Sequence, residues 1–222
     1  ADLGQGDNPA KLKKKALVQS PQDSLLASST ADTYSWLAST AMKQGDLEGA
    51  LILYSQSQQL LETQLKQKPQ DAPLMEVLAY TLSHQIAILT AQAKWQLAFD
   101  MSKQAFELLD KMHNQDPDNS YWRFERLNIQ AKQLILAAHL ISEQKSSQSS
   151  FITPLELFAQ FADQYSLSEQ NNKYLELKTI NLIAAIKYFQ ILGLWQESEL
   201  LLIELNQLST IAQSTSSSFS ME

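Results

Sequence analysis

Apolar residues recur at steps of three and four along most of the chain, which is the spacing of one face of an α-helix. Only five glycines and six prolines interrupt the 222 residues, so long helices joined by short connections are expected. In the helix predicted over 72–92, the polar residues Thr81 and Gln85 stand on the same stripe as Leu78 and Leu89. The pattern predicts helices over about 24–43, 47–66, 72–92, 95–114, 120–144, 154–164, 169–192 and 195–213.

The predicted helices begin and end at specific residues. Gly45 can take a positive φ after the first helix, and Asp46 can cap the next one. Asp71 and Asn119 stand at the same kind of helix start, and Pro73 follows in a first turn, where a missing N–H costs nothing. Outside the helices we expect a linker or loosely attached helix over 1–20, a Ser-rich loop over 145–152 and a disordered tail over 214–222.

The sequence contains an internal repeat of one helical unit. The segment 45–51 aligns with 93–99, and the segment 67–71 aligns with 115–119. The offset is 48 residues at both ends (93 − 45 and 117 − 69). Similarity at a fixed period is typical of stacked supersecondary units, in which each helix hides its apolar stripe against the next.

These unit boundaries resemble tetratricopeptide repeats. Gln44-Gly-Asp-Leu-Glu-Gly-Ala-Leu-Ile-Leu-Tyr54 is similar to that family's turn and second-helix start, and Asp116-Pro-Asp-Asn-Ser-Tyr-Trp122 is similar to its inter-unit turn. The second copy departs at Lys94-Trp95, where Gly-Asp is usual, and the spacing of 48 exceeds the family's 34. Long-helix variants of this kind resemble those appended to bacterial membrane-bound signalling proteins.

The expected fold is therefore all-α, an antiparallel helical-hairpin α-solenoid of seven to eight helices. Tetratricopeptide-like repeats are expected over 21–144, and a divergent C-terminal repeat or cap over 153–213.

Charge and composition limit the classes of partner and of chemistry expected for this chain. The formal net charge is −7, which disfavours nucleic acid and anionic membrane surfaces as partners. The four lysines in residues 11–15 are interpreted as a solvated tail or helix start. No cysteine is present, so thiolate and disulfide chemistry are excluded. The chain begins with Ala1, as a processed form or a piece of a longer protein would. The compartment stays open, with an extracytoplasmic one slightly favoured.

No catalytic or metal-binding pattern stands out. His84, His113 and His139 fall on three different predicted helices or helix ends, without metal-ligand spacing. Asp116 begins a stretch similar to a calcium loop, but Tyr121 stands where glycine is required. Neither a Gly-rich phosphate loop nor a Gly-x-Ser-x-Gly elbow occurs. We expect no enzyme activity, no cofactor and no metal.

The candidate partner-binding residues come from two predicted helices. The stretch Tyr121–Arg126 holds Trp122 and the only arginines, Arg123 and Arg126, which are residue types that often carry interface energy. The competing interpretation packs Trp122 under the preceding turn and pairs the arginines with Glu125 or a nearby acid. Further groove positions suggested by periodicity are Glu76, Tyr80, His84, Asn128 and Lys132 or Gln133. Core packing is expected for Trp36, Trp95 and Trp195.

The favoured function is a non-catalytic protein–protein interaction module, a scaffold or adaptor that holds a protein or peptide segment in its concave groove. A second hypothesis is a sensor of a small molecule or cell-wall fragment, with a pocket near Phe158, Phe161 and Phe189. A third is homodimerisation through the last helix.

Overall fold

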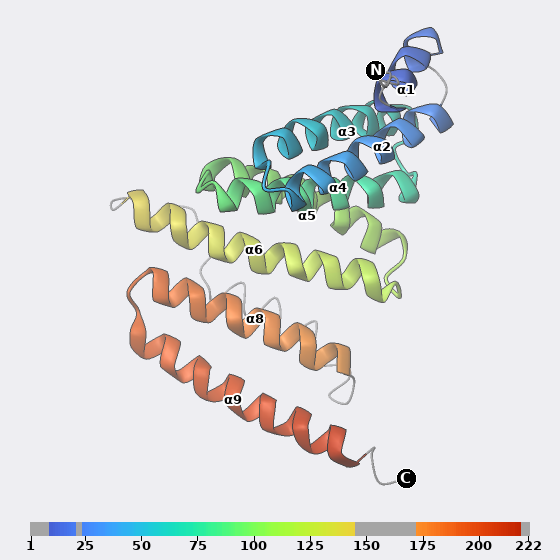
Figure 1. Ribbon diagram of the computed structural model, residues 1–222. Coiled ribbons are helices and arrows are strands. Elements are labelled where there is room, and N and C mark those ends of the chain that lie inside the picture. The colour runs from blue at the N-terminus through green and yellow to red at the C-terminus, as the bar shows by residue number, and fades with distance from the viewer. Residues whose placement is uncertain (1–8, 21–23, 145–171, 219–222) are drawn as a thin grey trace, which may run out of the picture. The chain divides into compact units, whose positions relative to one another are not determined.

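Helices account for nearly all of the residues that the structure describes. The computed structural model describes residues 9–20, 24–144 and 172–218, and these form eight helices and no strand (Figure 1). The all-α prediction is confirmed. The contacts divide the chain into two compact units, Ala1–Asp118 and Asn119–Glu222.

The observed helix bounds follow the predicted ones closely. In the first unit they are α1 (Pro9–Gln19), α2 (Ser24–Lys43), α3 (Leu47–Gln67), α4 (Ala72–Ala91) and α5 (Trp95–Gln115). In the second unit they are α6 (Ser120–Gln144), α8 (Asn172–Ile191) and α9 (Trp195–Ser218). Residues 9–19 are thus helical, which is one of the two alternatives for residues 1–20.

One predicted boundary is wrong. The last helix continues to Ser218 instead of ending near Gln213, because the Ser- and Thr-rich stretch contains neither glycine nor proline to stop it. The expected helix over 154–164 and the expected loop over 145–152 lie outside the described residues.

The 48-residue offset extends to the pattern of burial. Both α3 and α5 are 21 residues long. The buried residues of α3 are Ala50, Tyr54, Ser57, Leu61 and Gln64, and those of α5 are Ala98, Ser102, Ala105, Leu109 and Met112. Each residue in the second set follows its counterpart by 48 positions. The two helices therefore bury equivalent faces, even where Tyr54 is replaced by the much smaller Ser102.

Three turns between helices share one backbone conformation. Gly45, Ala93 and Gly193 have φ values of +83°, +55° and +75°. After each, the next N–H donates to a carbonyl five residues back, from Asp46 to Ala41 at 2.9 Å, from Lys94 to Leu89 at 2.9 Å and from Leu194 to Phe189 at 2.8 Å. This is the Schellman arrangement that ends a helix through a left-handed residue. Residues 192–196 thus form a third copy of the turn.

Side-chain caps begin three helices as predicted. The Asp46 carboxylate accepts from the N–H of Gly49 at 2.8 Å, and the Asp71 carboxylate accepts from that of Leu74 at 3.1 Å. The Asn119 amide oxygen accepts from the N–H groups of Tyr121 and Trp122 at 3.1 and 3.2 Å. Lys94 holds the equivalent position before α5 and provides no cap.

In the first unit each helix contacts the next one along the chain, from α1 to α5. Small side chains bring α2 and α3 together, because Ala31, Ala38 and Ala50 are fully buried. The buried Ser57 hydroxyl lies 3.0 Å from the Ser35 hydroxyl and donates to the carbonyl of Ala31 at 3.0 Å. The close approach of these helices therefore leaves no hydroxyl without a partner at this contact.

Helix α4 is the most buried helix of the first unit. Ten of its residues are buried, among them the four named for its stripe, Leu78, Thr81, Gln85 and Leu89. By length and composition alone it is the one described helix apolar enough to cross a membrane. Its contacts with α3 on one side and α5 on the other account for that apolar composition.

In the second unit α8 contacts both α6 and α9. One face of α6 packs on α8, because Leu127, Leu134 and Ala138 are buried in one cluster with Ala185 and Tyr188 of α8. An ion pair joins Lys178 of α8 to Glu204 of α9, with Nζ and Oε1 2.9 Å apart.

Candidate partner-binding residues

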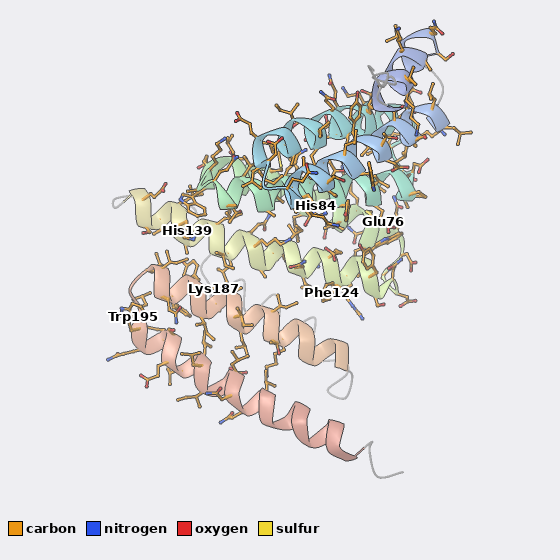
Figure 2. The ribbon with its side chains drawn as sticks, in the orientation of Figure 1. Glu76, His84, Phe124, His139, Lys187 and Trp195 are labelled. Carbon is orange, nitrogen blue, oxygen red and sulfur yellow. The ribbon has the colours of Figure 1, made fainter. Side chains whose placement is uncertain are left out.

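The predicted residues of α4 lie along its exposed strip. Glu76 and Tyr80 are exposed, with 49% of the Tyr80 surface accessible, and His84 is half-buried. The three residues follow each other at steps of four, so they share one face of the helix. Figure 2 shows Glu76 and His84 at separate turns of α4 in the first unit. The rest of the helix surface is largely covered, which leaves this strip as the part of α4 that a partner can reach.

An aromatic stack fixes the middle of the strip. The rings of His84 and Tyr54 are parallel within 1°, with centroids 5.1 Å apart. The Tyr80 and His84 rings pack in a T-shaped arrangement, with 4.3 Å between centroids and an interplanar angle of 70°. Tyr54 itself is fully buried, and its hydroxyl lies 2.8 Å from the Ser39 hydroxyl. The exposed Tyr80 ring is therefore supported through His84 and Tyr54 by residues of α3 and α2.

Burial also affects the chemistry of this stack. It raises the pKa of the Tyr54 hydroxyl, while the hydrogen bond with Ser39 acts in the opposite direction. Tyr54 therefore stays a neutral phenol at physiological pH. What the stack presents outward is the Tyr80 ring, which can stack on a planar group or receive a cation on its face.

The other three predicted residues lie on α6 in the second unit. Arg123 is exposed, while Trp122 and Arg126 are half-buried. The backbone N–H of Trp122 takes part in the Asn119 cap, so this cluster belongs to the first turn of α6. The structure thus brings Tyr80 and His84 together, and it places the arginines in a different unit from the α4 strip.

Two expectations for tryptophan are wrong. Trp36 and Trp195 are 67% and 65% exposed, where core packing was expected. On α2 the buried residues recur at steps of three and four and are small except for Tyr34, and Trp36 lies on the opposite face of the helix. Trp95 is half-buried. The prediction for Trp36 therefore assigned it to the wrong face of α2.

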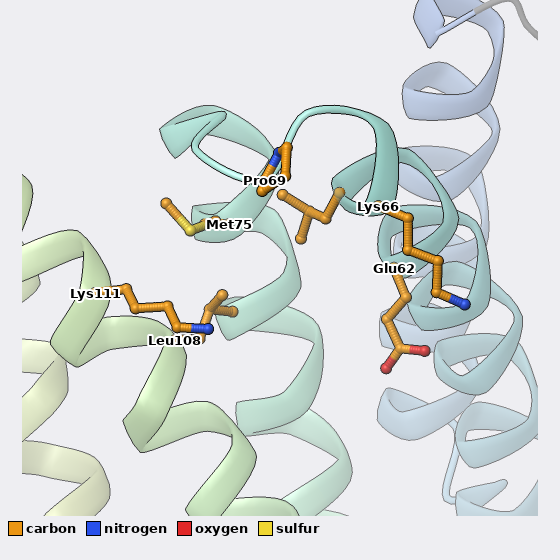
Figure 3. A pocket seen from close by; sticks show the side chains of 7 residues that line it. Glu62, Lys66, Pro69, Met75, Leu108 and Lys111 are labelled. Atoms are coloured by element: carbon orange, nitrogen blue, oxygen red, sulfur yellow. The ribbon is translucent and has the colours of Figure 1, made fainter.

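The sequence did not predict an open pocket of about 400 Å³ in the first unit (Figure 3). It lies between the end of α3, the start of α4 and the end of α5. Its lining residues are Glu62, Leu65, Lys66, Pro69, Met75, Leu108 and Lys111. The pocket that was predicted near Phe158, Phe161 and Phe189 cannot be compared with it, since Phe158 and Phe161 lie outside the described residues; Phe189 packs against the core of the second unit.

Burial shifts the pKa of two side chains on α6. The pKa of the His139 imidazole is lowered by burial, against a raising effect of Glu143. The pKa of the Lys132 amine is likewise lowered by burial, with Glu125 acting in the opposite sense. Within the ranges the structure describes, no group of three or more His, Asp or Glu side chains is placed to hold a metal ion.

Comparison with known proteins adds no relative. No protein-family model matches the chain, and no curated protein matches it significantly.

Proposed function

We propose that the helix pairs α2–α3 and α4–α5 are successive units of a tetratricopeptide-like solenoid that acts as a protein–protein interaction module. The equivalent burial of α3 and α5 at an offset of 48 supports this arrangement, as do the shared turns at Gly45 and Ala93. Contacts between helices that follow each other in the chain are what such an array requires.

In the proposed array, α2 and α4 are the first helices of their pairs and line the concave face. A segment of a partner protein would lie across the strip that Glu76, Tyr80 and His84 form on α4. The observation that carries this assignment is the Tyr80 ring, which is half-exposed yet held by the stack on His84 and Tyr54. An exposed aromatic side chain that is already fixed loses little conformational entropy when a partner binds.

The experiment is site-specific photo-crosslinking in cells that produce the protein. A benzoylphenylalanine at position 80 should give a discrete protein adduct. The same probe at position 52 or 97 serves as the matched control, because Ile52 and Leu97 are 56% and 58% exposed on α3 and α5. His84→Ala combined with the probe at position 80 should weaken the adduct, because the ring then loses its support.

Equal labelling from positions 52, 80 and 97, or no adduct from position 80, would reject the α4 strip as the binding surface. An adduct that survives His84→Ala unchanged would show that the preformed stack is not what the partner uses.

A further inference from the structure

The pocket beside α4 combines an apolar floor with a charged rim. The apolar part of the pocket lining consists of Met75, Leu65, Pro69 and Leu108. Met75 is the most buried of these, with 1% of its surface exposed. These four residues come from α3, the turn after it, α4 and α5, so the pocket forms where the two 48-residue copies meet (Figure 3). Its lining is separate from Tyr80 and His84, and it is independent of the surface proposed above for a partner segment.

The rim carries more positive than negative charge, on a protein whose formal net charge is −7. The carboxylate of Glu62 accepts a hydrogen bond from the Gln58 amide at 2.7 Å, so it is held along its own helix. Lys66 and Lys111 are exposed, and among the described residues neither forms an ion pair. Figure 3 shows the amine of Lys111 directed inward beside Leu108, whereas that of Lys66 points outward.

We propose that this pocket binds a small molecule with an aliphatic body and one carboxylate group. The body would cover Met75, Leu65 and Leu108, and the carboxylate would lie against the Lys111 amine. Ligand sites of this kind are mostly apolar, with few polar groups that fix orientation, and span roughly 300–1,000 Å³. A volume of about 400 Å³ suits a small ligand better than an extended peptide.

The test follows the methionine methyl resonances of the full chain by NMR. Met75 is one of five methionines and is assigned with a Met75→Leu variant. Octanoate, octanol and octylamine are titrated as probes of equal length and different charge. Octanoate should shift the Met75 resonance to saturation, octanol should bind more weakly, and octylamine weakest of all.

Two lysine variants separate the inward amine from the outward one. Lys111→Met should weaken octanoate binding about three- to fivefold, the upper range expected for one exposed charge pair, and leave octanol binding unchanged. Lys66→Met makes the same charge change on the same rim and should alter octanoate binding less than twofold.

An unshifted Met75 resonance would overturn the proposal, as would octylamine binding as well as octanoate or equal effects of the two variants. Saturation by an acetylated Leu-Asp peptide amide, with no response to octanoate, would reject the small-molecule assignment. Failure here leaves the crosslinking result at position 80 unaffected, because the two sites share no residue.

Discussion

At the scale of single residues, periodicity located buried positions better than polarity did. Thr81 and Gln85 were placed on the stripe of α4 despite being polar, and both are fully buried. Trp36 was assigned to an apolar stripe and therefore to the core, yet it lies opposite the buried residues of α2 and is exposed. Tyr54 is fully buried, and its stacking on His84 was not predictable, because that contact joins two helices whose rotation about their axes the sequence does not define.

Buried Gln85 yields a stability prediction. Its side chain is fully buried, and neither amide atom has a hydrogen-bond partner among the described residues. A buried polar group without a partner costs about 1–3 kcal/mol. Gln85→Met, with a side chain of similar length, should therefore raise the free energy of urea-induced unfolding by about 1 kcal/mol. Gln104→Met, on the exposed surface of α5, is the control and should change the free energy of unfolding little. A loss of stability in Gln85→Met would show that the Gln85 amide has hydrogen-bond partners in solution.

His139 makes part of the stability depend on pH. Burial lowers its pKa in the folded state below the ordinary value of about 6.5. Below that value the unfolded chain binds the proton more readily, so this contribution is fully present above pH 6.5 and is lost as the pH falls through the folded pKa. Urea unfolding at pH 7 and pH 5 should show a smaller loss for His139→Gln than for the natural chain.

The carboxylate of Glu143 provides the matching control for this titration. Because it raises the His139 pKa, Glu143→Gln should lower that pKa further when the imidazole resonances are followed by NMR. A pKa of His139 at or above 6.5 in the natural chain would contradict the assignment.

At the scale of helices, most of the fold could be read from local signals. Asp46, Asp71 and Asn119 were recognised as caps, and Gly45 as a turn residue, because the chemistry of each acts within a few positions in the chain. The end of α9 was misjudged because a Ser-rich stretch is weakly helical and nothing in it forces a stop. The pocket was missed because residues from three helices line it, and their relative placement comes only from packing.

The three equivalent turns give a prediction at this scale. Ala93 has φ +55° where Gly45 and Gly193 stand in the other copies, and a Cβ in that conformation costs roughly 1–2 kcal/mol. Ala93→Gly should raise the free energy of unfolding by about 0.5–1 kcal/mol once the greater freedom of glycine in the unfolded chain is deducted. Gly45→Ala should lower it by a similar amount. Thermal unfolding followed by circular dichroism measures both, and changes of the same sign would refute the equivalence of the turns.

At the scale of the whole chain, similar turn sequences have different consequences. Lys68–Asp71 and Asp116–Asn119 occupy equivalent places in the repeat, yet the first lies within one compact unit and the second spans the division between two. The internal break predicted from the sequence was the Ser-rich stretch 145–152, which lies outside the described residues. Turn residues define where a helix ends, whereas the division into units depends on which faces pack together, and no local signal encodes that.

The contacts in the first unit predict which of its helices open locally most and least readily. Helix α4 buries ten residues between α3 and α5, whereas α1 contacts α2 and leaves Leu12 and Val18 49% and 75% exposed. Local opening needs less free energy where fewer apolar contacts are lost, so backbone amides of α4 should exchange with deuterium slowest and those of α1 fastest. Mass spectrometry of the full chain measures this order.

The attachment of α1 can be varied without touching the core. The Lys13 amine donates to the hydroxyls of Ser29 and Thr33 at 2.6 and 2.9 Å, and to the carbonyl of Ser29 at 3.0 Å. Lys13→Met removes these three bonds, so exchange in α1 should accelerate severalfold while exchange in α4 stays constant. Equal protection of α1 and α4, or acceleration of both in Lys13→Met, would mean that the unit opens as a single cooperative body and that burial of α4 does not set a hierarchy within it.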